Sequence, residues 1–163
     1  MHLQGLIFKL LLSEISMTAM RLCVHILAYK EKLYFAPYVQ NINGHVSYHV
    51  PFEIVDANVI PLRIGECTIN AIDLAKKIDI QREALSDAVE GQLQIKTWAG
   101  VLKTCYHAFI FAEENQGVTS IKINRAIKNK GGLLREEMYR ITLDDPEDIG
   151  KKVLEALFFY KKT

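Results

Sequence analysis

A short sequence that occurs twice is the feature that most constrains how this chain can fold. Residues 64–72 recur as residues 149–157, with Ile, Gly and Ala identical and three further apolar positions kept or nearly so. Each copy follows a short run typical of a strand, at residues 52–55 and 139–142. A chain that repeats a unit of strands followed by a helix is typical of a structural scaffold. The repeated residues do not include a group of side chains that could act together in catalysis. The repeat therefore favours a binding protein over an enzyme.

Length and charge narrow the class of protein. The 163 residues fit one domain, with a core expected at 21–161, and half of them are hydrophobic. The 20 Lys and Arg residues balance 19 Asp and Glu residues, so the overall charge does not favour nucleic acid or an anionic membrane as partner. Three separated cysteines without a CxxC pair indicate reduced, buried thiols in a cytoplasmic protein.

Residues 1–20 are interpreted separately, as an N-terminal extension. Their apolar run is interrupted by Lys9 and closed by Glu14, and it is too short to span a bilayer. A signal peptide would carry its positive charge before the apolar run and a small-residue cleavage site after it, and this pattern is missing. We expect a short amphipathic segment packing on the domain, or an upstream extension with Met17 or Met20 as a later start.

The first half shows hairpin signals followed by a helix. Asn43-Gly44 is the strongest turn signal, because both residues tolerate positive φ. Pro37 removes a ladder donor and predicts an edge or a bulge at that end of its strand. Apolar spacing predicts a helix from Pro61 to Lys77. The predicted strands are residues 22–28, 33–39, 46–50 and 52–55.

The second half repeats this plan after a less readable stretch. A helix over residues 82–90 would end at Gly91, and Thr97 would cap a helix over 98–104 that turns Trp98, Val101 and Leu102 toward the core. The remaining elements are strands at 106–112, 118–124 and 138–143, a basic loop at 125–135, and a last helix at 147–161. Hairpin groups followed by helices predict an α+β fold with a mainly antiparallel sheet.

The histidines and cysteines are the candidates for chemistry. His45 and His49 lie four apart in a predicted strand, about 13 Å from each other, so they cannot share one zinc ion. Two other histidines each follow a cysteine by two residues, so each pair lies on one face of a strand and a Cys–His dyad stays an open alternative. The distance between residues two apart in a strand, about 6.6 Å, is longer than the hydrogen bond by which a histidine activates a thiol. These pairs are Cys23 with His25 and Cys105 with His107. We expect no catalytic residue, no metal and no cofactor; a small hydrolase or nucleotide-handling enzyme using His or Cys is the alternative.

The sequence lacks the common phosphate and nucleophile motifs. Gly131-Gly132 has no strand–turn–helix frame around it, and no Gly-x-Ser-x-Gly is present. The basic loop has no interleaved aromatic residues for base stacking. It is interpreted as a solvated loop, with a protein interface or a nucleic-acid contact as the other readings.

Several strings resemble those of contact-dependent growth inhibition immunity proteins (CdiI-type). They are Phe35-Ala36-Pro37-Tyr38-Val39 followed by the Asn43-Gly44 turn, Lys96-Thr97-Trp98 before a short helix, and residues 149–157. The resemblance covers residues 22–157; the N-terminal extension and residues 78–95 depart from it. It implies a small cytosolic antidote without catalytic activity. Such a protein binds, one to one, the C-terminal toxin domain of an adhesin, often a nuclease, and can accept a toxin hairpin at a sheet edge.

The contact residues of such a binder should combine aromatic anchors with charges that steer encounter. The exposed candidates are Tyr48 and His49 beside the predicted sheet edge, and Lys128, Lys130 and Arg135 in the basic loop. Both regions could instead be solvated turns. The interface would then lie elsewhere, on the acidic stretch of Glu83, Asp87 and Glu90.

Overall fold

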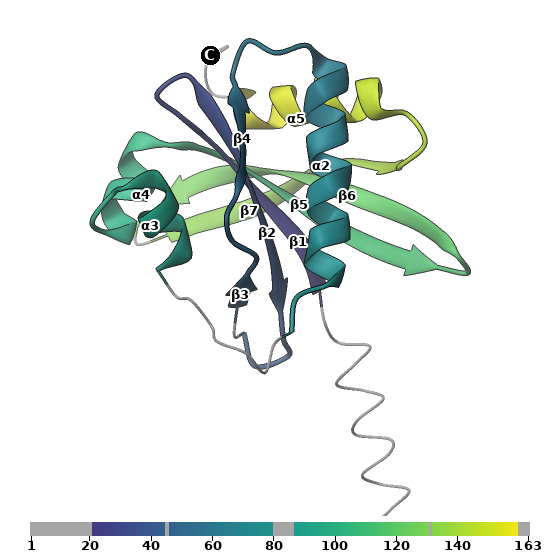
Figure 1. The fold of residues 1–163 in the computed structure, drawn as a ribbon, viewed down its shortest axis with the longest axis horizontal. Coiled ribbons are helices and arrows are strands. Elements are labelled where there is room, and N and C mark those ends of the chain that lie inside the picture. Colours follow the sequence, from purple (N-terminus) through teal and green to yellow (C-terminus); the bar gives the residue numbers. More distant parts are fainter. Residues whose placement is uncertain (1–20, 45, 80–86, 131, 160–163) are drawn as a thin grey trace, which may run out of the picture.

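The protein is built on a seven-stranded antiparallel sheet. The computed structural model describes residues 21–44, 46–79, 87–130 and 132–159. The strands follow the order β3-β2-β1-β5-β6-β7, and β4 also pairs with β2 (Figure 1). The strands are β1 (Arg21–Tyr29), β2 (Lys32–Gln40), β3 (Val46–Tyr48), β4 (Glu53–Asp56), β5 (Tyr106–Asn115), β6 (Val118–Asn129) and β7 (Gly132–Thr142). The described helices are α2 (Pro61–Lys76), α3 (Ala88–Leu93), α4 (Trp98–Thr104) and α5 (Pro146–Leu157). The predicted α+β class is confirmed.

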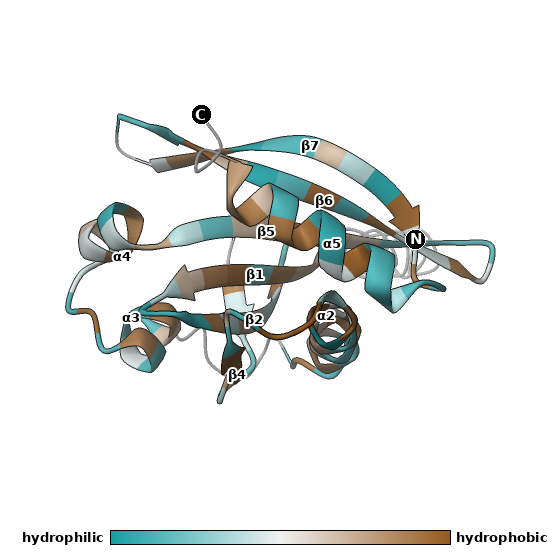
Figure 2. Ribbon diagram, turned by 90° about the horizontal axis from the view of Figure 1, so that it is seen from above, coloured by the Kyte–Doolittle hydropathy of each residue, from teal (hydrophilic) through white to brown (hydrophobic). Residues whose placement is uncertain are grey.

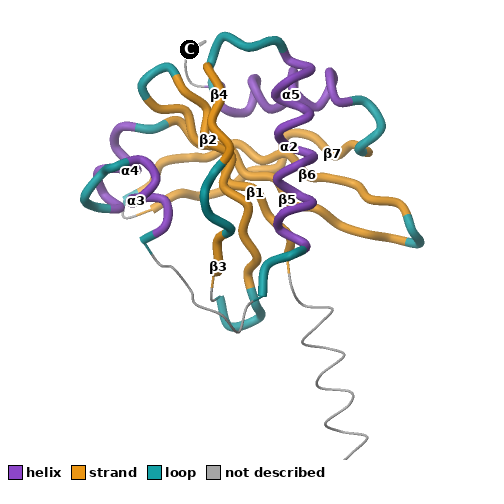
Figure 3. Tube along the Cα trace, viewed as in Figure 1, coloured by secondary structure: helices purple, strands orange, loops and turns teal. Residues whose placement is uncertain are grey.

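Two halves of the same plan make up this sheet. Strands β1 to β4 lead into α2, and strands β5 to β7 lead into α5, as the tube trace makes clear (Figure 3). The halves join through β1 and β5, which pair antiparallel from Leu22 opposite Ala112 to Ala28 opposite Tyr106. The two first strands of the repeat therefore lie side by side at the centre of the sheet.

Helices α2 and α5 cross on one face of the sheet at their repeated glycines. A side chain at Gly65 would lie 1.7 Å from the Pro146 carbonyl oxygen, and one at Gly150 would lie 1.8 Å from the Pro61 carbonyl oxygen. Only glycine permits this approach, so each helix begins against the glycine of the other. The duplication and the close approach of the helices, both expected from the sequence, are confirmed.

The main core lies between these two helices and the sheet. The inward stripe of α2 includes Ile64, Cys67 and Ile72, and that of α5 includes Ile149 and Val153; all are fully buried. They meet alternate residues of the four longest central strands, because successive side chains of a strand point to opposite faces. These strand residues are Val24, Ile26, Leu33, Phe35, Ala108, Ile110, Ile121 and Ile123.

The opposite face carries a smaller apolar cluster under α3 and α4. Leu27 and Ala36 of the sheet pack there with Phe52, Val89 and Val101. Both short helices lie at one end of the sheet, away from α2 and α5 (Figure 2). The sheet residues of this cluster, Leu27 and Ala36, come from β1 and β2.

Several sequence predictions need correction. Residues 125–129 and 132–135 are not a basic loop, because they continue β6 and begin β7; only Lys130 of this stretch lies in the described part of the turn. Gly91 does not end a helix but lies inside α3, whereas residues 80–86 lie outside the described part of the chain. Pro37 is buried within β2, between the stretch that pairs with β4 and the stretch that pairs with β3. The interruption of pairing that proline imposes is thus found inside the sheet.

Candidate functional site

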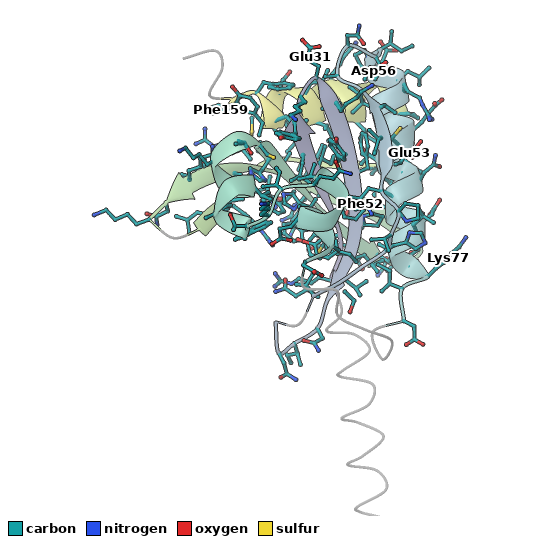
Figure 4. The ribbon with its side chains drawn as sticks, turned by 60° about the vertical axis from the view of Figure 1, so that its left-hand side comes forward. Glu31, Phe52, Glu53, Asp56, Lys77 and Phe159 are labelled. Carbon is teal, nitrogen blue, oxygen red and sulfur yellow. The ribbon has the colours of Figure 1, made fainter. Side chains whose placement is uncertain are left out.

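The sheet has two edges of different length. At one edge lie the short strands β3 and β4, the latter marked by Glu53 and Asp56 in Figure 4. At the other lies β7, whose 11 residues pair only with β6 among the described strands. A long edge strand presents backbone N–H and C=O groups to an incoming chain. A register shift beside Ile123 and Asn124 interrupts the ladder, so the run of β7 before it is the regular part of this edge.

The three basic candidates lie on the hairpin formed by β6 and β7. Lys128 is the second-last residue of β6, Lys130 follows the strand in the turn, and Arg135 lies in β7; all three are exposed. Neighbouring cations are paired, as Lys122 Nζ is 2.6 Å from a Glu113 oxygen. None of the three candidates has a carboxylate partner among the residues that the structure describes. The hairpin therefore presents three uncompensated positive charges.

Arg135 is held over aromatic rings on the face opposite α2 and α5. Its guanidinium carbon lies 4.1 Å from the ring centre of Phe109 and 5.2 Å from that of Phe111. Such stacking fixes a planar cation without neutralising its charge. Burial and then His107 lower the pKa of His25, and the charge of Arg135 adds to this effect; burial raises the pKa of Tyr48, and the charge of Arg135 opposes that rise.

The two candidates on the other hairpin do not form one surface. Tyr48 packs on Tyr38 and Phe52, with ring centres 5.2 and 6.0 Å away, and burial raises its pKa to about 12. His49 follows it in an extended segment, with its N–H donating to the Pro37 carbonyl, and so points to the opposite side. Both are half-buried, so the expectation that they are exposed is wrong. His45 lies outside the described residues.

The histidines at the starts of the two halves form a buried pair. His25 Nε2 and His107 Nδ1 are 2.9 Å apart, and their side chains are 0% and 4% exposed. Burial holds the pKa of His25 well below its usual value; burial and then Lys128 lower that of His107 to about 4. Both rings are therefore neutral near pH 7, and the N–H of one ring donates a hydrogen bond to the ring nitrogen of the other.

The cysteines do not form dyads with these histidines. All three thiols are free and buried. Burial raises the pKa of Cys23 to about 11 and raises that of Cys105, so neither is a thiolate at neutral pH. The Cys105 sulfur lies 3.8 Å from the Thr104 hydroxyl, and His25 is engaged by His107 instead. Within the described ranges there is no group of three or more side chains that could hold a metal ion.

Trp98 is a surface residue that sequence reasoning placed in the core. It is the first residue of α4, which Thr97 caps by accepting a hydrogen bond from the Gly100 N–H at 3.0 Å. This start turns Val101 inward but leaves Trp98 40% exposed, with its ring centre 6.2 Å from that of His25. Leu134, 54% exposed on β7, is a second exposed apolar side chain; it lies in the stretch that the sequence predicted to be a basic loop. Helical periodicity could not reveal the exposure of Trp98, since it assumes one buried face for the helix.

The acidic alternative is only partly described. Glu83 lies outside the described residues, Asp87 precedes α3 and is exposed, and Glu90 within α3 is half-buried. None of the described helices is both long and apolar enough to cross a membrane.

Comparisons with known proteins give likenesses of structure. No family model matches the sequence, and no curated protein matches it significantly. A protein of unknown function from Neisseria meningitidis matches with a TM-score of 0.55 and 18% identity, over 84% of this chain and 93% of that one. A chain of the CdiA-CT/CdiI toxin and immunity complex from Yersinia pseudotuberculosis matches with a TM-score of 0.56 and 12% identity, over 84% and 95%. At such identities the likeness establishes a shared fold.

Proposed function

We propose that this protein is an immunity protein that binds and neutralises the C-terminal toxin domain of a contact-dependent growth inhibition adhesin. The observation that carries the proposal is the likeness to a chain of a toxin and immunity complex, which extends over most of both chains. Such an inhibitor acts by stoichiometric one-to-one binding in the cytoplasm. The toxin is expected to be a nuclease, and the inhibitor itself contacts neither nucleic acid nor a membrane.

Chemistry within the chain supports binding over catalysis. A hydrolase using histidine or cysteine needs a nucleophile and a base that substrate can reach. Here His25, His107, Cys23 and Cys105 are all at most 4% exposed. Burial also keeps His25 and His107 neutral and the thiols of Cys23 and Cys105 protonated, as the directions of their pKa shifts show.

The contact surface that we propose is the hairpin of β6 and β7 with its free edge. Lys128, Lys130 and Arg135 would steer an acidic surface of the toxin, because none has a carboxylate partner among the described residues. Leu134, which is 54% exposed, would add apolar contact. A toxin segment could then pair with β7 as an added strand. Tyr48 and His49 stay secondary candidates on the opposite edge.

Pull-down and growth protection test the proposal. The full chain is co-expressed with the toxin region encoded directly upstream and, in parallel, with an unrelated toxin domain. We expect stable 1:1 capture of the upstream toxin alone, and survival of cells that carry both genes. Failure to bind that toxin, or to protect against it, would contradict the proposal.

Amide hydrogen exchange tests where the toxin binds. Complex formation should slow exchange of the β7 amides, and the variant Lys128→Glu/Lys130→Glu should weaken binding by at least about tenfold, as expected for loss of charged contacts worth over 1.4 kcal/mol. The control is Lys76→Glu on α2, which reverses a charge already paired with Glu114. Protection confined to β3 and β4 would place the interface at the other edge.

A further inference from the structure

A cavity opens where two neighbouring strands separate. β5 and β6 pair from Asn115 opposite Val118 to Ala108 opposite Arg125, and their pairing stops there. β5 continues along β1, with His107 opposite Leu27, while β6 continues along β7, with Lys128 opposite Leu133. The sheet is thus split between β5 and β6 at this end.

The cavity at this split has a volume of about 260 Å³. This is near the lower end of ligand pockets, ~300–1,000 Å³, so it suits a small molecule. Its walls are mostly apolar and come from both faces of the sheet, since Leu157 belongs to α5 and Ala126 to β6. The lining residues are Cys105, Tyr106, His107, Ala126, Lys128 and Leu157.

Two polar groups at this cavity are incompletely paired among the described residues. Lys128 is exposed and makes no ion pair with any described carboxylate. His107 is 4% exposed; its Nδ1 atom pairs with His25, whereas its Nε2 atom makes no hydrogen bond of standard geometry within the described part of the chain, although the Val101 backbone is close enough to raise its pKa. A buried ring nitrogen without a well-formed hydrogen bond is costly, and Lys128 adds an unpaired cation to an otherwise apolar lining.

We propose that this cavity binds a small aliphatic monocarboxylate. The carboxylate pairs with the Lys128 ammonium, and the hydrocarbon chain lies against Ala126 and Leu157. His107 stands beside the carboxylate as a second polar contact. The proposal does not depend on toxin binding, because it concerns a separate ligand, although Lys128 of β6 would take part in both.

Proton linkage gives this binding a signature. The groups that face His107 are His25 from β1, Lys128 from β6 and the Val101 carbonyl from α4; burial and Lys128 hold its pKa down, and Val101 opposes them. A bound carboxylate favours the protonated ring and raises this pKa. Binding then takes up a proton, so affinity should rise as the pH falls from 7 toward 5.

Nuclear magnetic resonance of the labelled full chain tests the site, with sodium butyrate and sodium hexanoate as probes. We expect saturable shifts at Cys105, His107 and Ala126, tighter binding of hexanoate, and a higher pKa of His107 in its presence. Sodium chloride at the same ionic strength is the control. Equal shifts with chloride, or no saturable shift, would overturn the proposal.

Matched variants test the role of each wall. Lys128→Gln should weaken hexanoate binding by about tenfold, as for loss of a charged hydrogen bond, but leave hexanol binding unchanged. Lys130→Gln, in the same hairpin but outside the lining, should change neither. Ala126→Leu should abolish both, with the fold checked by the unchanged spectrum of α2. Equal effects of the two lysine variants would exclude the site.

Discussion

Gly65 and Gly150 occupy equivalent places in the two halves, and each faces the backbone that begins the other's helix. Gly65 lies against Pro146, the first residue of α5, and Gly150 lies against Pro61, the first residue of α2. The contact is reciprocal, so one pair of glycines fixes how both helices cross and how both cover the sheet.

Replacing either glycine should therefore be severe. Gly65→Ala places a methyl group within 1.7 Å of a backbone oxygen that cannot move alone, so we expect a loss of about 3 kcal/mol or more in the free energy of unfolding. Urea denaturation measures it. Gly91→Ala is the matched control, since nothing lies within 4 Å of that added atom. It should stabilise α3 by up to about 1 kcal/mol. Similar losses in both variants would show that the crossing is not tightly packed.

Stability should fall in mild acid because of the buried histidine pair. The folded-state pKa of His107 is about 4, below the usual 6.5, so the unfolded chain binds more protons between these values. The free energy of unfolding therefore rises with pH between about 4 and 6.5. As the pH falls through this window, His107 alone should lower the free energy of unfolding by roughly 3 kcal/mol. Unfolding free energies at pH 7, 6, 5 and 4.5 measure the slope.

His107→Gln separates this contribution from those of the carboxylates. Glutamine can still hydrogen-bond to His25 but does not titrate, so the variant should show a shallower slope between pH 6.5 and 4. An unchanged slope would mean that His107 is protonated as easily in the folded protein as in the unfolded chain.

The thiols should be unreactive in the folded protein. Burial raises the pKa of Cys23 to about 11 and that of Cys67 to about 12. A disulfide reagent at pH 8 should modify none of the three cysteines rapidly, and all three after denaturation. Cys23→Ser and Cys105→Ser should keep toxin protection while losing some stability. A folded serine variant that no longer protects would favour the enzyme reading.

Lysine should not be able to replace Arg135 without a loss of stability and of toxin binding. Arg135→Lys keeps the charge but loses planar stacking on Phe109 and Phe111, which should cost about 0.5–1 kcal/mol in unfolding free energy. It should also weaken toxin binding measured by calorimetry. Arg140→Lys is the control, because its guanidinium pairs instead with Glu137. Equal effects of the two substitutions would show that stacking is unimportant.

Local signals made much of the fold predictable. The helix predicted over residues 61–77 is α2, Thr97 caps α4, and Asp145 caps α5 by accepting from the Asp148 N–H. The Asn43-Gly44 turn is also present, with Gly44 at φ 81°. Each of these depends on residues close in sequence, which is why a single sequence suffices.

Features set by distant contacts could not be predicted in the same way. Lys128 and Arg135 suggested a loop by polarity, yet they belong to strands whose exposed side chains leave little apolar alternation. The exposure of Trp98 depends on how α4 lies on the sheet. The pairing of β1 with β5 joins segments far apart in the chain. The predicted contact residues stay predictions until a complex is measured.

The central pairing of β1 with β5 also has a consequence for folding. All other described strand pairs join segments close in sequence, whereas this pair joins the starts of the two halves. Bringing β1 and β5 together closes a long loop of chain. This step is slow, because the conformational entropy of the loop is lost before the new strand contacts compensate for that loss. The strands of each half can pair early by themselves, and the later pairing of β1 with β5 should be the step that limits the folding rate. Substitutions along that seam should therefore slow refolding, whereas those at the outer edges should mainly speed unfolding.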